Sequence, residues 1–156
     1  MSRSKGKRIG IRPLIVIGAL TAVCLVLLLR TAHGPHFLKV EGDGVVAIQT
    51  RDFKPGSVEF YSYRDRAGAE LRFLLARDSG GTLHAAMDAC QRCYNHHKGY
   101  VTSHGYLVCK FCGNRYKLEA MESGLASCVP VKLPIQVTGQ RVKIRSADLE
   151  HERGLF

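Results

Sequence analysis

Residues 90–113 read CQRCYNHHKGYVTSHGYLVCKFCG and contain two C-x2-C pairs, Cys90/Cys93 and Cys109/Cys112, separated by fifteen residues. Two intervening residues allow one tight turn to direct both sulfurs of a pair toward a single point. A hairpin between the pairs brings the second turn opposite the first. Four soft thiolates prefer zinc, iron or an iron–sulfur cluster over magnesium or calcium. The spacing therefore predicts a metal centre with four cysteine ligands.

Two other uses of these cysteines stay open on the sequence. Two disulfides would be stable outside the cytoplasm, and a C-x2-C pair can act as a thiol redox centre. The thiol redox motif usually adjoins a βαβ unit, whereas the residues around these pairs have the pattern of β-hairpins. Covalent haem attachment is excluded because neither pair is followed by histidine: Tyr94 and Gly113 stand there.

A fifth cysteine, Cys128, follows Cys112 by sixteen positions. It is a further ligand, a residue beside the centre, or a free thiol, and a free thiol outside the cytoplasm is vulnerable to oxidation. Histidines in the same region are possible ligands or ordinary surface residues: His96, His97 and His104. Positive side chains around the pairs would tune an anionic centre, bind an acidic partner, or simply form a solvated rim: Arg92, Lys98, Lys110 and Arg115.

The chain after residue 44 has the pattern of a small β protein. Short runs of β-forming residues alternate with turn signals such as Lys54-Pro55-Gly56. The predicted strands are 45–50, 57–63, 70–77, 82–88, 100–102, 106–108, 133–137 and 141–144. Their length and spacing are typical of a β-sandwich or barrel, so we predict a mostly β domain over 45–146. Residues 31–44 are expected to be a linker, and residues 147–156 a polar tail that is a helical turn or disordered.

The N-terminal segment differs from the rest in charge and hydropathy. Residues 1–12 carry five cations, and residues 13–29 contain no charged residue over 17 positions. This length falls within the ~17–25 residues of a membrane-spanning helix and exceeds the apolar region of most cleaved signal peptides, ~7–15 residues. We therefore predict one uncleaved transmembrane anchor over 13–30 in the cell inner membrane. The N-terminus would be cytoplasmic and the rest of the chain periplasmic.

The formal net charge of +10 arises mainly from this segment. Six cations and no acid lie in residues 1–30, whereas residues 31–156 hold 17 cations and 13 acids. A basic N-terminus beside an apolar segment is typical of a membrane protein, so no nucleic-acid partner is expected. The sequence also lacks a Ser-His-Asp set, paired carboxylates and a phosphate-binding glycine loop, so nothing in it indicates an enzyme with its own substrate.

The order of these motifs resembles that of Rieske proteins. Those proteins have a Pro-Gly turn, two ligand loops separated by a hairpin, and a Leu-Pro segment before the last hairpin. The matching residues are Pro55-Gly56, Cys90–Cys93, Cys109–Gly113 with Tyr116, and Leu133-Pro134. The chain departs from the Rieske pattern at the two ligand histidines, where it has Cys93 and Cys112. The resemblance implies a Rieske-like β fold, and thiolate in place of imidazole implies a lower reduction potential.

A closer resemblance is to the FtrD-like family of membrane iron–sulfur proteins. The shared residues are Met87-Asp88-Ala89-Cys90-x-x-Cys93-Tyr94, Lys98-Gly99-Tyr100, Val108-Cys109-Lys110-x-Cys112-Gly113-x-x-Tyr116 and Ser127-Cys128-x-Pro130. Most members have Gly-Gly before the fifth cysteine, where this chain has Ala126-Ser127. The resemblance implies an iron–sulfur cluster, attachment to the membrane, and proximity to iron-permease components.

The resulting hypothesis is a single-span membrane protein whose periplasmic β domain holds an iron–sulfur cluster, [2Fe–2S] or [4Fe–4S]. The expected ligands are Cys90, Cys93, Cys109 and Cys112, with Cys128 in an auxiliary role beside the cluster. The expected activity is electron transfer with other redox proteins or membrane iron-transport components, which links the protein to iron uptake. Two alternatives are a structural zinc module, since closed four-cysteine sites are typically structural, and an extracytoplasmic thiol oxidoreductase.

Overall fold

The computed structural model describes residues 34–121, 123 and 128–156. All the strands and helices described here belong to one unit, residues 35–156. The predicted transmembrane segment, residues 13–30, lies outside the described residues. Within the described part of the chain, no helix is long and apolar enough to cross a membrane.

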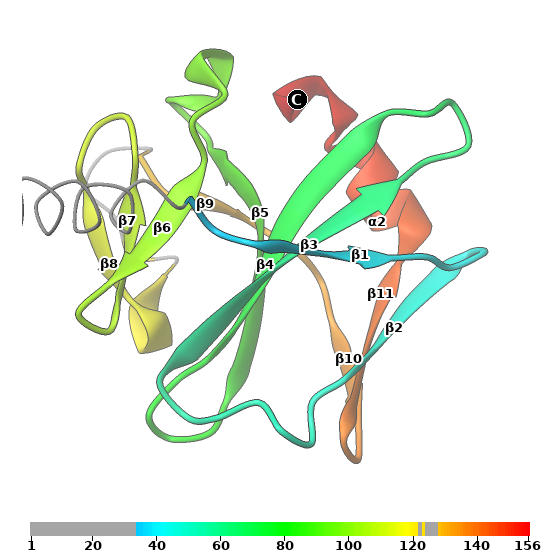
Figure 1. The fold of residues 1–156 in the computed structure, drawn as a ribbon, viewed down its shortest axis with the longest axis horizontal. Coiled ribbons are helices and arrows are strands. Elements are labelled where there is room, and N and C mark those ends of the chain that lie inside the picture. Colours follow the sequence, from blue (N-terminus) through cyan, green and yellow to red (C-terminus); the bar gives the residue numbers. More distant parts are fainter. Residues whose placement is uncertain (1–33, 122, 124–127) are drawn as a thin grey trace, which may run out of the picture. The chain divides into compact units, whose positions relative to one another are not determined.

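A five-stranded sheet forms the centre of the fold, in the order β1-β3-β4-β5-β9 (Figure 1). Neighbouring strands are antiparallel except for β1 and β3, which run parallel. The strands are β1 (Phe37–Val40), β3 (Ser57–Arg64), β4 (Glu70–Arg77), β5 (Leu83–Cys90) and β9 (Pro130–Lys132). Short hairpins join β3 to β4 and β4 to β5, so the centre of the sheet is formed by residues that are close in sequence.

The central strand β4 contributes side chains to two hydrophobic cores, one on each face of the sheet. Phe73 and Leu75 belong to the first core, whereas Leu74 and Ala76 belong to the second. Successive residues of a strand point to opposite faces, so a strand covered on both sides is expected to be continuously apolar. All four side chains are fully buried, which agrees with this expectation.

The first core lies between the central sheet and a three-stranded sheet in the order β10-β11-β2. These strands are β10 (Gln136–Thr138), β11 (Arg141–Arg145) and β2 (Val45–Gln49). In β2 and β11, buried and exposed residues alternate, and Val46 and Ile48 lie opposite Ile144 and Val142. This period of two directs one apolar face toward the core and the other face toward solvent. The two sheets together form a sandwich.

The third sheet covers the opposite face of the central sheet, and the second cysteine pair follows its middle strand, whereas the first pair begins at the end of β5. Its strands follow the order β6-β7-β8. They are β6 (Tyr100–Ser103), β7 (Tyr106–Cys109) and β8 (Arg115–Lys117). The 3-10 turn η1 (Tyr94–His96) precedes them in sequence, and a second, η2 (Leu118–Ala120), follows. Tyr100, Leu107 and Tyr116 pack with Phe60 and Leu74 of the central sheet in the second core. In sequence this sheet lies between β5 and β9, two strands that pair with each other.

The mostly β class predicted from the sequence is confirmed, but the ordered domain is longer than the sequence indicates. Strand β1 lies within the segment expected to be a linker. The expected polar tail instead forms helix α2 (Ser146–His151) and a 3-10 turn, η3 (Arg153–Leu155). Leu149 of α2 is fully buried in the first core. In the structure this segment forms helical turns that pack on the first core.

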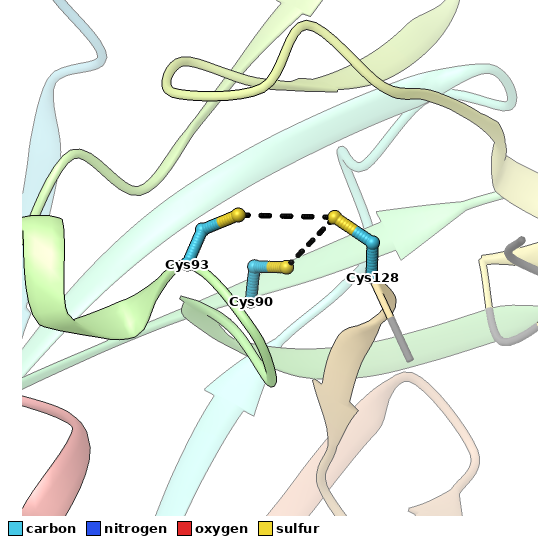
Figure 2. A group of neighbouring side chains, drawn as sticks. All are labelled: Cys90, Cys93 and Cys128. Atoms are coloured by element: carbon cyan, nitrogen blue, oxygen red, sulfur yellow. Dashed lines mark hydrogen bonds between the residues drawn. The ribbon is translucent and has the colours of Figure 1, made fainter. Parts of the chain in front are cut away.

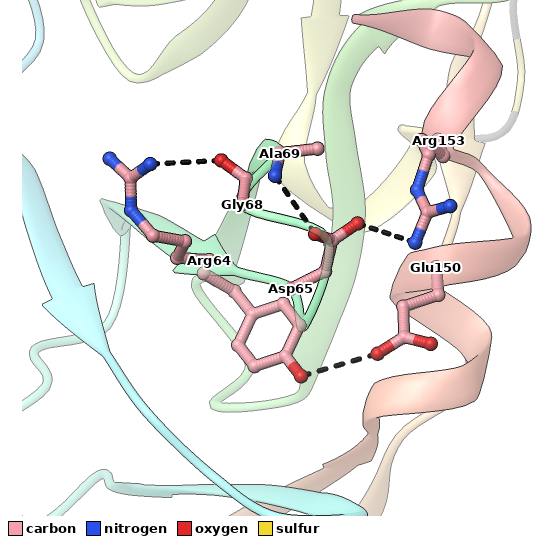
Figure 3. Close-up of polar contacts among 7 residues, drawn as sticks. Arg64, Asp65, Gly68, Ala69, Glu150 and Arg153 are labelled. Carbon is pink, nitrogen blue, oxygen red and sulfur yellow. Dashed lines mark hydrogen bonds and ion pairs between the residues drawn. The ribbon is translucent and has the colours of Figure 1, made fainter.

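Polar contacts attach this C-terminal segment to the β3–β4 hairpin (Figure 3). The Arg153 guanidinium lies 2.5 Å from Oδ2 of Asp65, and the Ala69 amide donates to Oδ1 of the same carboxylate at 2.8 Å. The Tyr63 hydroxyl donates to Glu150 of α2 at 3.3 Å. Burial opposes ionisation of Asp65, but the Ala69 amide and Arg153 hold the pKa of its carboxyl below its ordinary value. A charged pair therefore joins the hairpin to the C-terminal turn.

Replacing Leu149 by Ala should destabilise the domain by about 2–5 kcal/mol, because a fully buried side chain is lost and a cavity remains. Urea unfolding followed by circular dichroism measures the effect. His151→Ala is the matched control, since His151 is exposed on the same helix and its loss should change the free energy of unfolding by less than ~0.5 kcal/mol. Equal stability of the Leu149→Ala variant and the parent would show that α2 does not pack on the core.

Candidate metal centre

The two cysteine pairs occupy tight turns at the ends of strands. Cys90 is the last residue of β5, and Cys109 is the last residue of β7. The Cys93 amide donates to the Cys90 carbonyl at 3.2 Å, and the Gly113 amide donates to the Cys109 carbonyl at 2.9 Å. Gly113 has a φ of +74°, a conformation that glycine adopts without strain. Each pair therefore occupies one turn, as its spacing predicts.

The sulfurs of both turns meet the sulfur of the fifth cysteine. Cys128 Sγ lies 3.4 Å from Cys90 Sγ, 3.8 Å from Cys93 Sγ and 3.3 Å from Cys112 Sγ, and Figure 2 shows the first two contacts. The sulfurs of Cys93, Cys109 and Cys112 form a second group, all within 4.8 Å of one another. All five thiols are free, and only that of Cys112 is exposed. The structure thus brings the four predicted ligands together and places Cys128 among them.

Two hydrogen bonds hold the Cys128 segment against the turns. The Gln91 amide donates to the Val129 carbonyl at 3.0 Å, and the Tyr116 hydroxyl donates to the carbonyl of Cys128 itself. Cys128 is only 7% exposed, with β9 beginning two residues later beside the end of β5. The Cys128 thiol is therefore buried beside the other sulfurs and not exposed to solvent.

A buried carboxylate and a close backbone approach connect the two turns. The Tyr100 amide donates to Oδ1 of Asp88 at 2.7 Å, and the Lys110 amide donates to the Gly99 carbonyl at 3.0 Å. A Cβ atom at Gly99 would overlap the Asp88 carboxylate, so only glycine fits there. Burial raises the pKa of Asp88 to about 7, against the opposing effects of the Tyr100 amide, Lys110 and Arg72. These contacts fix the first turn relative to the second.

Backbone amides favour the ionised thiol at two of the five positions. Burial alone would raise the pKa of the Cys90 thiol, but the amides of Arg92 and Cys93 donate to its sulfur and lower that pKa below its ordinary value. At Cys112 burial likewise opposes ionisation, whereas the Asn114 amide and neighbouring thiols lower the pKa. One thiol in each C-x2-C pair therefore ionises more readily than an ordinary cysteine and can bind a cation as thiolate.

The other three thiols resist ionisation. Burial is the main reason that the pKa values of Cys93 and Cys109 are raised, and neighbouring sulfurs add to the effect. Burial also raises the pKa of Cys128 to about 11, with contributions from the thiols beside it. Like charges crowded in a buried site repel one another, so a cation is required to keep all five sulfurs ionised.

The hydroxyl of Tyr100 is a buried donor beside the sulfur of Cys90. Tyr100 is fully buried, and no hydrogen-bond partner of its hydroxyl is found among the described residues. Burial, followed by negative charge at Cys90, raises the pKa of this hydroxyl, so it stays a neutral donor. Buried polar groups seldom go without a partner. A sulfide or ligating thiolate of a metal–sulfur group would accept this hydrogen bond, so the donor set and the orphaned hydroxyl both fit such a group.

The histidines near the pairs do not join the sulfurs. Among the described residues, both groups of closely spaced potential ligands consist of cysteines alone. His96 instead stacks on Phe111, with the ring centroids 3.5 Å apart. His97 is exposed after η1, and His104 Nδ1 lies 2.9 Å from the Ser103 hydroxyl in the β6–β7 turn. Surface roles, the simpler of the two interpretations of these residues, agree with their positions.

A cavity of about 270 Å³ adjoins the centre. Its lining includes the side chains of Cys90, Cys93 and Cys109, together with Lys98 and the C-terminal Phe156. The second core covers the sulfurs elsewhere, because four of the five cysteines belong to it. Small molecules can therefore approach the sulfurs through the cavity and at the exposed Cys112.

Sequence reasoning identifies the cysteines but assigns no role to Asp88, Tyr100 or Tyr116. Asp88 fixes the turns, Tyr100 offers a donor, and Tyr116 holds the Cys128 segment. All three stand within the motifs shared with the FtrD-like family. Their presence in the shared motifs could have marked these residues as functional, but the spacing of the motifs does not indicate what each residue contacts.

Gly99→Ala should destabilise the domain by more than ~1–2 kcal/mol, the cost of a left-handed conformation for a residue with a side chain. The φ at Gly99 is +64°, and the added Cβ would also displace the Asp88 carboxylate. Gly105→Ala is the matched control, because its φ is +77° but its Cβ would meet open space. Urea unfolding and metal analysis of both variants make the comparison. If Gly99→Ala and Gly105→Ala lost equal free energy of unfolding, the contact between residues 88 and 99 would not stabilise the turns.

Comparison with protein-family models matches residues 53–156, two thirds of the chain, to a model described as membrane iron-sulfur containing protein FtrD-like. Comparison with curated proteins gives no match. The matched region includes all five clustered cysteines and the residues that position them. The resemblance inferred from the motifs is confirmed, and the chain belongs to the FtrD-like family of membrane iron–sulfur proteins.

Proposed function

We propose that this protein transfers single electrons through an iron–sulfur cluster held in the periplasm by an N-terminal membrane anchor, in the context of iron uptake. The observation that carries the proposal is the meeting of five free cysteine sulfurs in one pocket of a chain from a membrane iron–sulfur family. Four cysteine thiolates are the usual ligand set of both [2Fe–2S] and [4Fe–4S] clusters. Among the described residues, no histidine joins either group of sulfurs.

The cluster would be held by the cysteines of the two turns, Cys90, Cys93, Cys109 and Cys112, with Cys128 as a fifth sulfur beside them. The bound cluster supplies a one-electron redox couple. The chain orients the thiolates through its turns and excludes water with the second core. Tyr100 offers its hydroxyl to a sulfur. Such a hydrogen bond favours the more negative, reduced state and raises the reduction potential.

The topology supports a Rieske-like architecture for the domain. A three-stranded sheet is inserted between two paired strands of a β-sandwich, β5 and β9. The turns lie at the ends of β5 and β7. The exposed Cys112 would bring one edge of the cluster to the surface, which suits electron exchange with a partner.

A structural zinc site is the second candidate, and the sulfur spacing is the observation that favours it. Cys128 Sγ lies 3.3–3.8 Å from three other sulfurs. In a tetrahedral site with zinc–sulfur bonds of about 2.3 Å, the sulfurs are separated by about 3.8 Å. Zinc protein is colourless and contains no acid-labile sulfide, so purification under anaerobic conditions separates the two candidates.

Replacing any one of Cys90, Cys93, Cys109 or Cys112 by Ser should remove most of the iron and sulfide from anaerobically purified protein. It should also lower the melting temperature, because binding of the metal is coupled to folding. Cys128→Ser should reduce the iron content and alter the electron paramagnetic resonance signal of the reduced protein. Iron, sulfide and zinc analysis with this spectrum provides the readout.

Cys24→Ser is the matched control, since Cys24 lies in the predicted membrane span and outside the matched region. It should change neither iron content nor spectrum. Full iron and sulfide in Cys109→Ser would contradict the assigned ligands. Stoichiometric zinc without sulfide in the parent would favour the second candidate.

A further inference from the structure

Positive charge is concentrated in the cysteine module, defined as residues 89–117. Of the 17 cations and 13 acids in residues 31–156, the module holds five cations and no acid, which leaves 12 cations and 13 acids elsewhere. The module therefore carries a formal charge of +5, whereas the rest of residues 31–156 carries −1. Its cations are Arg92, Lys98, Lys110, Arg115 and Lys117.

Three of these cations lie beside the sulfurs. Arg92 is exposed between the two cysteines of the first turn, and Lys110 is exposed within the second. Lys98 lines the cavity that adjoins the sulfurs, and the bond from the Lys110 amide to Gly99 holds the two loops together. Among the described residues, no ion pair involves any of these three cations.

The two acids that line the cavity beside the sulfurs, Asp88 and Glu70, do not compensate this charge at the surface. Asp88 is buried beneath Gly99, where its carboxylate accepts the Tyr100 amide. Glu70 is partly exposed and lies 3.1 Å from Arg72, whose charge balances it. An approaching molecule therefore meets a positive potential at the turns.

An exposed aromatic pair lies in the two loops that carry these cations. The rings of His96 and Phe111 are 3.5 Å apart between centroids and 11° from parallel, so they stack face to face. His96 follows the first turn, and Phe111 lies between the two cysteines of the second. Phe111 is 50% exposed, although it is a large apolar side chain. An aromatic centre with a charged rim is a common composition for a protein interface.

We infer that this face, the His96–Phe111 stack with Arg92, Lys98 and Lys110, docks an acidic redox protein. The inference rests on the proposed function, because it requires a cluster behind the face. Opposite charge accelerates encounter, and a small charged interface releases its partner quickly, as electron transfer requires. In each encounter one electron leaves the reduced cluster and enters the oxidised partner. No bond is made or broken in that step.

Small charged oxidants and polyanions test this face without knowledge of the natural partner. The probes are ferricyanide, an anion, and hexaammineruthenium(III), a cation, each mixed by stopped flow with reduced, cluster-loaded full-length protein in neutral detergent. Oxidation by ferricyanide should slow by about tenfold or more from low to high salt, whereas oxidation by the cation should not slow. Poly-L-glutamate should slow the ferricyanide reaction at low salt, and an uncharged polymer of similar length should not.

Charge-reversal variants locate the effect. Lys98→Glu and Lys110→Glu should each slow ferricyanide oxidation several-fold at low salt and weaken the inhibition by poly-L-glutamate. Lys143→Glu is the matched control, because it makes the same change in net charge on β11, outside the module. Its rates should stay within about twofold of the parent, since β11 packs on the face of the central sheet opposite the module. Iron and sulfide content, measured for every variant, shows that the cluster is intact.

The outcomes separate the two proposals. Equal slowing by Lys143→Glu and Lys98→Glu would mean that net charge alone governs the rate, which would overturn the docking face. The docking face would also be overturned if the rate at which ferricyanide oxidises cluster-loaded protein changed neither with salt nor with poly-L-glutamate. Protein that contains no cluster would instead overturn the proposed function.

Discussion

Crowding of five cysteine sulfurs in one pocket is the constraint to which the rest of the structure responds. Three of the thiols have raised pKa values because they are buried near one another, whereas backbone amides lower the pKa at Cys90 and Cys112. Several thiolates cannot be buried together without a compensating cation. The pocket therefore favours metal binding energetically, and part of the free energy of folding is expected to come from that binding.

The scaffold supports this pocket by covering both faces of one sheet. Strand β4 contributes alternate side chains to the two cores, so the sandwich and the cysteine module share a continuous framework. The turns are then joined by short polar contacts, with Asp88 and Gly99 in close approach and Tyr116 holding the Cys128 segment. A site supported in this way keeps its geometry, because few of its atoms are free to move.

Much of this architecture can be predicted from the sequence, and what escapes prediction has physical causes. The two C-x2-C turns are local, so their spacing is sufficient to predict them. The alternation in residues 82–88 places Leu83, Ala85 and Met87 on one face of the strand. Asp88 lies on the other face, which is buried only because the cysteine module covers it, and the alternation does not predict that cover. The position of Cys128 depends on the pairing of β5 with β9. The number of residues between Cys112 and Cys128 does not predict that pairing. Helix α2 is short and buries a single large apolar side chain, Leu149, so the sequence shows no apolar repeat there.

The central claim is that these five sulfurs enclose an iron–sulfur cluster. Native mass spectrometry of the full-length protein, purified without oxygen and released from detergent in the gas phase, tests it most directly. The account predicts a mass excess equal to one intact cluster of iron and sulfide, which the parent retains and Cys109→Ser loses. A mass excess of a single zinc ion, or a bare chain lighter by two hydrogens for each disulfide, would contradict it.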